Sequence, residues 1–124
     1  MGLLDKLIGN AAEVDVSEVS DELAPILGEG ETLARVFKEI RDMYVFTNKR
    51  LVLIDKQGLT GRKVEYRSVP YKAITMFTLE TAGHFDMDAE LKIWVSGQSS
   101  PIEKELNKHT VVGIQQTLAT YLPH

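Results

Sequence analysis

The sequence predicts a mainly β, α+β domain: seven antiparallel strands form a barrel, a C-terminal helix caps it and short N-terminal helices precede it. From residue 33 onward, β-rich runs alternate with turn residues, and their starts lie 10, 8, 11, 11, 17 and 11 residues apart. Connections this short exclude parallel crossovers, which need about a dozen or more residues. The final run has apolar residues at helical spacing and needs an apolar surface to cover.

The first residues predict a short helix with one apolar side. Leu3, Leu4, Leu7 and Ile8 lie on that side, and Gly9-Asn10 ends the helix. This apolar stripe has three candidate contacts: the barrel of its own chain, a neighbouring subunit, or a membrane surface. Binding to a membrane would be weak, because four apolar side chains bury little area and the adjacent segment is acidic.

A second helix is expected to begin near Asp15, whose side chain suits an N-cap. Glu18 follows at the spacing of a capping box, and Val14 and Val19 are placed as a hydrophobic staple. Pro25, with the glycines after it, should end this helix.

Seven strands and a final helix should make up the rest of the chain. Asn48-Lys49 suits a tight hairpin turn, because asparagine tolerates a left-handed backbone and bonds its own main chain. The helix is capped by Asn107 or Thr110 and is ended by Pro123. The strands are expected at about 33–40, 43–48, 51–56, 62–69, 73–81, 90–96 and 101–106. The expected core residues are Val45, Leu53, Ile74, Ile93, Trp94 and Leu118.

The composition excludes several kinds of chemistry. The 124 residues include no cysteine, which excludes disulfides, thiolate metal sites and cysteine nucleophiles. The three histidines are far apart and lack partners at metal-ligand spacing, so neither a metal nor a cofactor is expected. We identify no catalytic residue, because no Ser-His-Asp order or G-x-S-x-G turn occurs. Without a signal-like or membrane-length apolar run, the prediction is a cytoplasmic protein that is not an enzyme.

Charge is segregated along the chain, although the net charge is only −4. Residues 1–32 carry one base and eight acids, residues 33–72 ten bases and four acids, and residues 73–124 three bases and six acids. The bases of residues 33–72 have two interpretations. They are either solvated on strand surfaces, or they form a face that binds an anionic ligand or the acidic segment 1–32. The candidate anion-binding residues are Lys49, Arg50, Arg62 and Lys63.

The order of these motifs resembles the bacterial pleckstrin-homology domain family, whose fold is a PH-like barrel. The resemblance rests on RDMYVFTNKRLVLID at 41–55, followed by LTGRK at 59–63, Glu65-Tyr66, Pro70-Tyr71, Ile74 and ETAG at 80–83. It implies two near-orthogonal antiparallel sheets with a capping helix, and a non-enzymatic protein that assembles into homo-oligomeric rings. We divide the chain into a helical leader, 1–30, and a barrel with its helix, 31–124, within one domain.

Two functions remain open. The first is a non-catalytic binding and assembly module that forms a homo-oligomeric ring, with a pentamer as the first expectation, and takes an unidentified protein or peptide partner. The second is a peripheral membrane or anionic-lipid-binding protein. The first hairpin loop, near residues 39–42, disfavours lipid headgroups because it holds Arg41 beside two acids. No nucleic acid is expected, because the strand-first, helix-last order does not match an RNA-reading platform.

Overall fold

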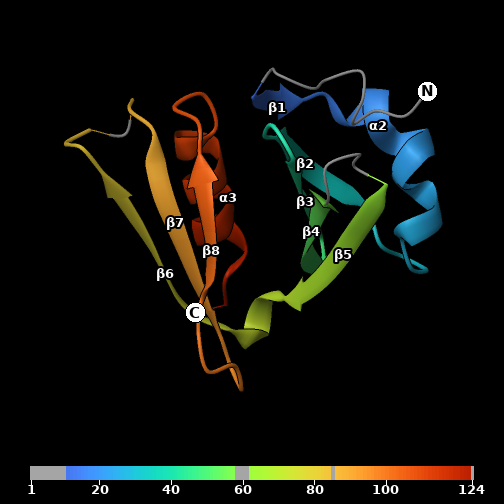
Figure 1. Cartoon of the computed structure of the whole chain (residues 1–124). Coiled ribbons are helices and arrows are strands. Elements are labelled where there is room, and N and C mark those ends of the chain that lie inside the picture. Colours follow the sequence, from blue (N-terminus) through green and yellow to red (C-terminus); the bar gives the residue numbers. More distant parts are fainter. Residues whose placement is uncertain (1–10, 58–61, 85, 124) are drawn as a thin grey trace.

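The computed structural model describes residues 11–57, 62–84 and 86–123. Within these ranges eight strands form two antiparallel sheets, and three short helical segments and one longer C-terminal helix accompany them (Figure 1). The strands are β1 (Ala12–Val14), β2 (Leu33–Lys38), β3 (Asp42–Thr47), β4 (Arg50–Gln57), β5 (Lys63–Pro70), β6 (Ile74–Thr81), β7 (Ala89–Val95) and β8 (Ile102–Leu106). The helical segments are α2 (Val16–Leu23), η1 (Ala24–Ile26), η2 (Tyr71–Ala73) and α3 (Val111–Tyr121).

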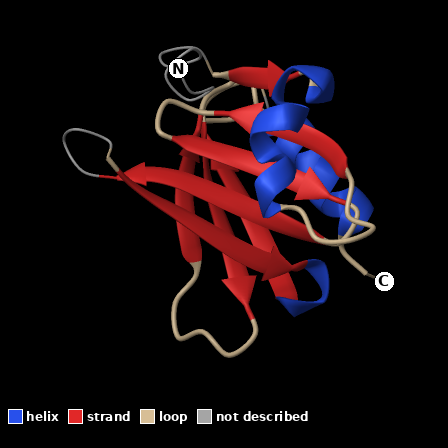
Figure 2. Ribbon diagram, turned by 90° about the vertical axis from the view of Figure 1, so that its right-hand side faces the viewer, coloured by secondary structure: helices blue, strands red, loops and turns tan. Residues whose placement is uncertain are grey.

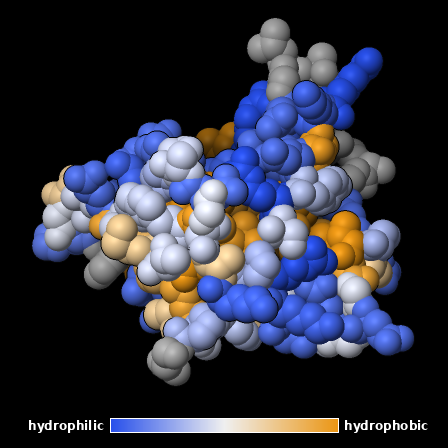
Figure 3. Space-filling view, turned by 90° about the horizontal axis from the view of Figure 1, so that it is seen from below, coloured by the Kyte–Doolittle hydropathy of each residue, from blue (hydrophilic) through white to orange (hydrophobic). Residues whose placement is uncertain are grey.

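The five-stranded sheet has the order β1-β2-β3-β4-β5, and the three-stranded sheet has the order β6-β7-β8. The short 3-10 helix η2 joins the sheets at the lower end of Figure 1. In Figure 2 the strands of one sheet run across those of the other. Seen from below, apolar side chains gather in the middle of the molecule and hydrophilic ones border them (Figure 3).

The expectation of seven strands is wrong by one, because β1 was not predicted. β1 pairs antiparallel with β2, from Ala12 opposite Lys38 to Val14 opposite Val36. It is only three residues long. Pairing with β2 gives this segment its extended conformation. The sequence of the segment does not reveal the strand, because three residues are too few for an alternation of apolar and polar residues to indicate one. The other seven strands are confirmed, with ends within about two residues of those expected.

Helix α2 confirms the helix expected near Asp15. The Asp15 side chain accepts a hydrogen bond from the Ser17 amide at 2.9 Å, as an N-cap does. The helix ends at Leu23, and Pro25 lies in the 3-10 helix η1 that follows. The helix expected around Leu3 to Ile8 lies outside the described residues.

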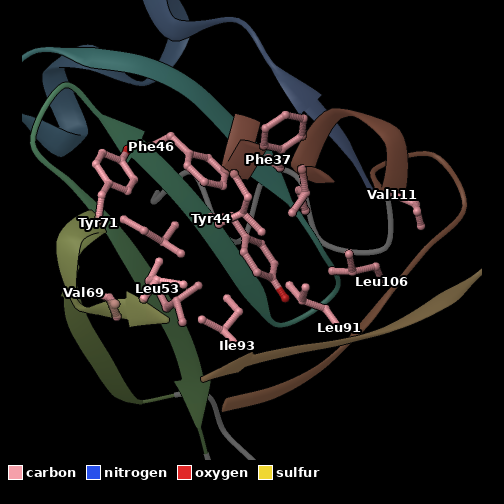
Figure 4. Packing of buried hydrophobic residues seen from close by; sticks show 14 of the residues in the cluster. Phe37, Tyr44, Phe46, Leu53, Val69, Tyr71, Leu91, Ile93, Leu106 and Val111 are labelled. Atoms are coloured by element: carbon pink, nitrogen blue, oxygen red, sulfur yellow. The ribbon is translucent and has the colours of Figure 1, made fainter. Parts of the chain in front are cut away.

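The middle strands β3 and β4 of the five-stranded sheet are largely buried on both faces. Tyr44 and Leu53 pair across β3 and β4 and face the space between the sheets, whereas Val45 and Val52 pair on the opposite face, toward α2. The outer core, under α2, comprises Val14, Val19, Leu23, Val36, Met43, Val45, Val52 and Ile54. The inner core (Figure 4) comprises Phe37, Tyr44, Phe46, Leu51, Leu53, Val69, Tyr71, Ile74, Ala89, Leu91, Ile93, Leu106, Val111, Ile114 and Leu118.

The predicted core is confirmed in part. Val45 is buried, but it lies in the outer core rather than inside the barrel. Trp94 is only half-buried, because side chains alternate along β7 and its neighbour Ile93 takes the inward position. The remaining predicted residues lie in the inner core: Leu53, Ile74, Ile93 and Leu118.

Helix α3 lies close against β2, and a glycine allows this approach. A Cβ at Gly113 would lie 2.4 Å from Cε2 of Phe37. The Arg35 guanidinium lies 5.0 Å from the centroid of the same ring. Arg35 also pairs with Glu13 at 2.8 Å and donates to the Thr117 hydroxyl at 3.1 Å. One arginine thus connects β1, β2 and α3.

The tight turn expected at Asn48-Lys49 joins β3, which ends at Thr47, to β4, which begins at Arg50. Asn48 does not use the left-handed backbone that asparagine tolerates, because among the described residues only glycines have a positive φ. Its side chain instead accepts a hydrogen bond from the Thr32 amide at 2.8 Å and donates to the Gly30 carbonyl at 3.1 Å. Asn48 therefore ties this turn to the loop that precedes β2.

Candidate functional site

A groove of about 830 Å³ opens where β6 and β8 end and β7 begins, at the upper end of Figure 1. It is lined by residues 39–42, 55, 80–82, 88–90 and 103–107, and we name it the acidic groove. Eight of its sixteen lining residues are aspartate or glutamate, and two are lysine or arginine. Both sheets contribute carboxylates, so negative charge surrounds the opening between them.

Two aspartates face each other on the wall that β3 and β4 form. Asp42 is paired directly with Asp55, and like charges in this position destabilise a sheet. Lys104 of β8 lies between them: its Nζ is 3.3 Å from Asp42 Oδ1 and 3.5 Å from Asp55 Oδ2. Burial raises the pKa of Asp42, the Lys104 charge lowers it and the Asp55 charge raises it. Lys104 therefore connects the two sheets, with one cation serving two carboxylates.

Glu39 anchors the start of α3 beside the groove. Its buried carboxylate accepts hydrogen bonds from the Asn107 amide at 3.0 Å and from the Thr110 hydroxyl. Burial raises the pKa of Glu39, and these hydrogen bonds oppose the shift. The neighbouring Lys38 is also buried, and its ammonium group donates to the carbonyls of Glu39 and Ile40. The β2–β3 hairpin is thus held by buried charges at the edge of the groove.

Tyr44 brings an unpaired hydroxyl close to these acids. Its side chain is 0% exposed, and within the described part of the chain its hydroxyl has no hydrogen-bond partner. It points from β3 toward Leu91 and Leu106 (Figure 4), and Leu106 also lines the groove. Burial raises the pKa of Tyr44 well above its ordinary value, and the charges of Asp42 and Glu39 add to this effect. A buried polar group without a partner costs about 1–3 kcal/mol, so a native protein that keeps one calls for an explanation.

The groove suits an organic cation better than a metal ion. Across the described ranges, no three His, Asp or Glu side chains are arranged to hold a metal. The groove also has an apolar part, because Ile40 lines it and is 60% exposed. Carboxylates beside an exposed apolar side chain can bind a ligand that is both positively charged and partly apolar.

The structure does not bring the four candidate anion-binding residues together. Arg50 begins β4 next to Lys49, whereas Gln57 ends β4 and is paired with Lys63, which Arg62 precedes. The length of β4, roughly 23 Å at 3.3 Å per residue, therefore separates the two pairs of bases.

Arg50 and Lys49 are engaged within the fold. The Arg50 guanidinium contacts the Glu31 carboxylate at 2.8 and 2.9 Å and donates to the Ile26 carbonyl at 2.7 Å. Arg50 lowers the pKa of Glu31 to about 2, although burial opposes this shift. Lys49 donates to the Glu29 carbonyl at 2.9 Å. These two bases fasten β4 to the segment that follows α2.

The predicted apolar stripe, Leu3, Leu4, Leu7 and Ile8, lies outside the described residues, and its contact stays a prediction. Over the parts of the chain that the structure describes, no helix is long and apolar enough to cross a membrane.

The acidic groove was not predicted from the sequence. Glu39, Asp42 and Asp55 are three of the four acids in the basic segment 33–72, and the net charge of that segment concealed them. One signal was available, because a hairpin turn at 48–49 places Asp42 opposite Asp55. Lys104 carried no such signal, because it comes from the other sheet.

Comparison with known proteins gives the family. A family model for the bacterial PH domain matches residues 2–122. The uncharacterized protein YjqA of Bacillus subtilis is 51% identical over 121 residues, which cover 96% of this chain and 97% of the relative. A DUF1696 family protein with a pleckstrin-homology domain from Shewanella loihica, known from a crystal structure, is 64% identical with a TM-score of 0.79, over 93% of this chain and 99% of that one. A pleckstrin homology domain from Shewanella amazonensis is 59% identical with a TM-score of 0.81, over 99% of this chain and 100% of that one. The chain described here belongs to the bacterial PH domain family.

Proposed function

We propose that this chain is a non-catalytic binding and assembly module. It associates with copies of itself into a cyclic homo-oligomer and presents its acidic groove to a partner.

The observation that carries the assembly is a pair of long strand edges. β5 is one of the two edge strands of the five-stranded sheet and β6 is one of the two edge strands of the three-stranded sheet, and each is eight residues long. Tyr66 on β5 is 57% exposed, and Met76 on β6 is 48% exposed. Strand edges that expose large apolar side chains favour pairing with another chain.

These edges support a ring. A contact between β5 of one copy and β6 of the next joins two different surfaces. Repetition of such a contact closes into a ring when the rotation between neighbours permits. With the family resemblance, a pentamer remains the first expectation.

Light scattering on the full chain tests the assembly. We expect a mass that is a multiple of 13.9 kDa. Tyr66→Glu and Met76→Glu should lower it, because each places a charge at an edge. Val112→Glu on the exposed side of α3 is the matched control and should leave the mass unchanged. A native mass of 13.9 kDa would refute the ring.

The alternative, binding to an anionic membrane, has less support. The candidate bases lie in two separate pairs, and the acidic groove repels anionic headgroups. Co-sedimentation with anionic vesicles that persists after Arg62→Ala and Lys63→Ala would speak against electrostatic binding through that pair. Loss of co-sedimentation in the same variants would favour the membrane function.

A further inference from the structure

We propose that the acidic groove binds a lysine-bearing segment of a partner protein, whose ammonium group displaces that of Lys104 from Asp42 and Asp55. This deepens the proposed function, on which it rests, by naming the chemistry of the partner.

The first argument is the balance of charge. Eight carboxylates and two basic side chains line the groove, and a cleft lined by one sign of charge concentrates ligands of the opposite sign. Lys104 contacts its two aspartates at 3.3 and 3.5 Å. Charge-assisted hydrogen bonds between nitrogen and oxygen are usually about 2.7–2.9 Å long. The Lys104 contacts are therefore loose, and a ligand that makes shorter ones can replace them.

The second argument is independent of the acids. The Tyr44 hydroxyl is buried, lacks a partner within the described residues and points toward Leu106 of the groove (Figure 4). A phenolic hydroxyl can accept a hydrogen bond from an ammonium group and can donate one to a carbonyl. A peptide that carries a lysine brings both groups. Tyr44 does not line the groove, whereas Leu106 does, so the hydroxyl gains this partner if the Leu106 side chain moves as the ligand binds.

The apolar part of the groove favours a protein segment over other cations. Ile40 is 60% exposed beside the carboxylates, and the alkyl stem of a lysine can cover it while its head stays charged. Nucleic acids and anionic lipids are repelled by the same carboxylates. The described carboxylates do not form a metal site.

Calorimetric titration with a short blocked peptide that alternates lysine and leucine tests the proposal on the full chain. The same peptide acetylated at every lysine is the matched probe, because it keeps the shape and loses the charge. We expect the charged peptide to bind at least about tenfold more tightly than the acetylated one. Asp55→Asn should weaken binding about tenfold, and Glu65→Gln on β5, outside the groove, should not change it.

Two further variants separate the ligand contacts from folding. Tyr44→Phe removes only the unpaired hydroxyl, so thermal stability should not fall, while binding should weaken about threefold or more. Lys104→Met removes the resident competitor, so the charged peptide should bind more tightly.

Several results would overturn the proposal. One is equal binding of both peptides, and another is binding that neither Asp55→Asn nor Tyr44→Phe alters. A drop in assembly mass for Asp55→Asn would show that a second copy fills the groove. Light scattering of the same samples separates the proposals, because peptide binding by a monomeric chain refutes the ring and leaves the groove ligand intact.

Discussion

Replacing Gly113 by alanine should destabilise the protein, although alanine favours helices. The new Cβ would lie 2.4 Å from Cε2 and 2.9 Å from Cζ of Phe37, whereas carbon atoms in contact prefer about 3.5–4.0 Å. The Phe37 ring cannot retreat freely, because it is buried and meets the Phe46 ring edge-on at 5.9 Å between centroids. Overpacking of this kind costs about 1–3 kcal/mol and more where the clash is severe. The helix propensity of alanine offsets about 1 kcal/mol, so we expect a net loss of about 2 kcal/mol.

Thermal unfolding measures this loss. For a chain of this size we expect the melting temperature to fall by about 6–10 °C. Ala119→Gly, on the exposed side of α3, measures the propensity contribution alone. In a Phe37→Leu background, Gly113→Ala should become neutral or stabilising, because the ring edge that it meets is gone. A higher melting temperature for Gly113→Ala in the native background would refute the reasoning.

Three further predictions concern stability. Glu31→Gln should make the free energy of unfolding fall less steeply as pH drops from 4.5 to about 2. The reason is that a carboxyl with a lowered pKa stabilises the fold above its ordinary pKa and loses that contribution as pH falls. Urea midpoints across this pH range check the prediction. Asn48→Ala should lower the free energy of unfolding by about 1 kcal/mol for each lost hydrogen bond, whereas Gln98→Ala in an exposed turn should change it little. Equal effects of the two variants would contradict the role of Asn48 in connecting its turn to the loop before β2. Leu23→Ala should cost about 2–5 kcal/mol in urea unfolding, and no change would mean that α2 does not cover the sheet.

Local patterns predicted those parts of the fold that local interactions determine. Asp15 could be identified as an N-cap because the contact lies two residues away, and the β3–β4 hairpin because alternation and turn residues agree. The alternation of side chains along β3 and β4 could not show whether Val45 and Val52 point into the barrel or away from it, because both faces of these strands are apolar. β1 and the contact of Lys104 with Asp42 depend on distant partners, so only the assembled structure shows them.

Burial of β3 and β4 on both faces has a consequence for local opening. Exposing the amides of β3 and β4 requires loss of the inner and outer cores together, so their hydrogen exchange should approach the rate set by global unfolding. β6 lies at an edge, and most of its side chains are exposed or half-buried, so its amides should exchange faster. We therefore expect the wall that carries Asp42 and Asp55 to open less often than the β6 edge of the acidic groove.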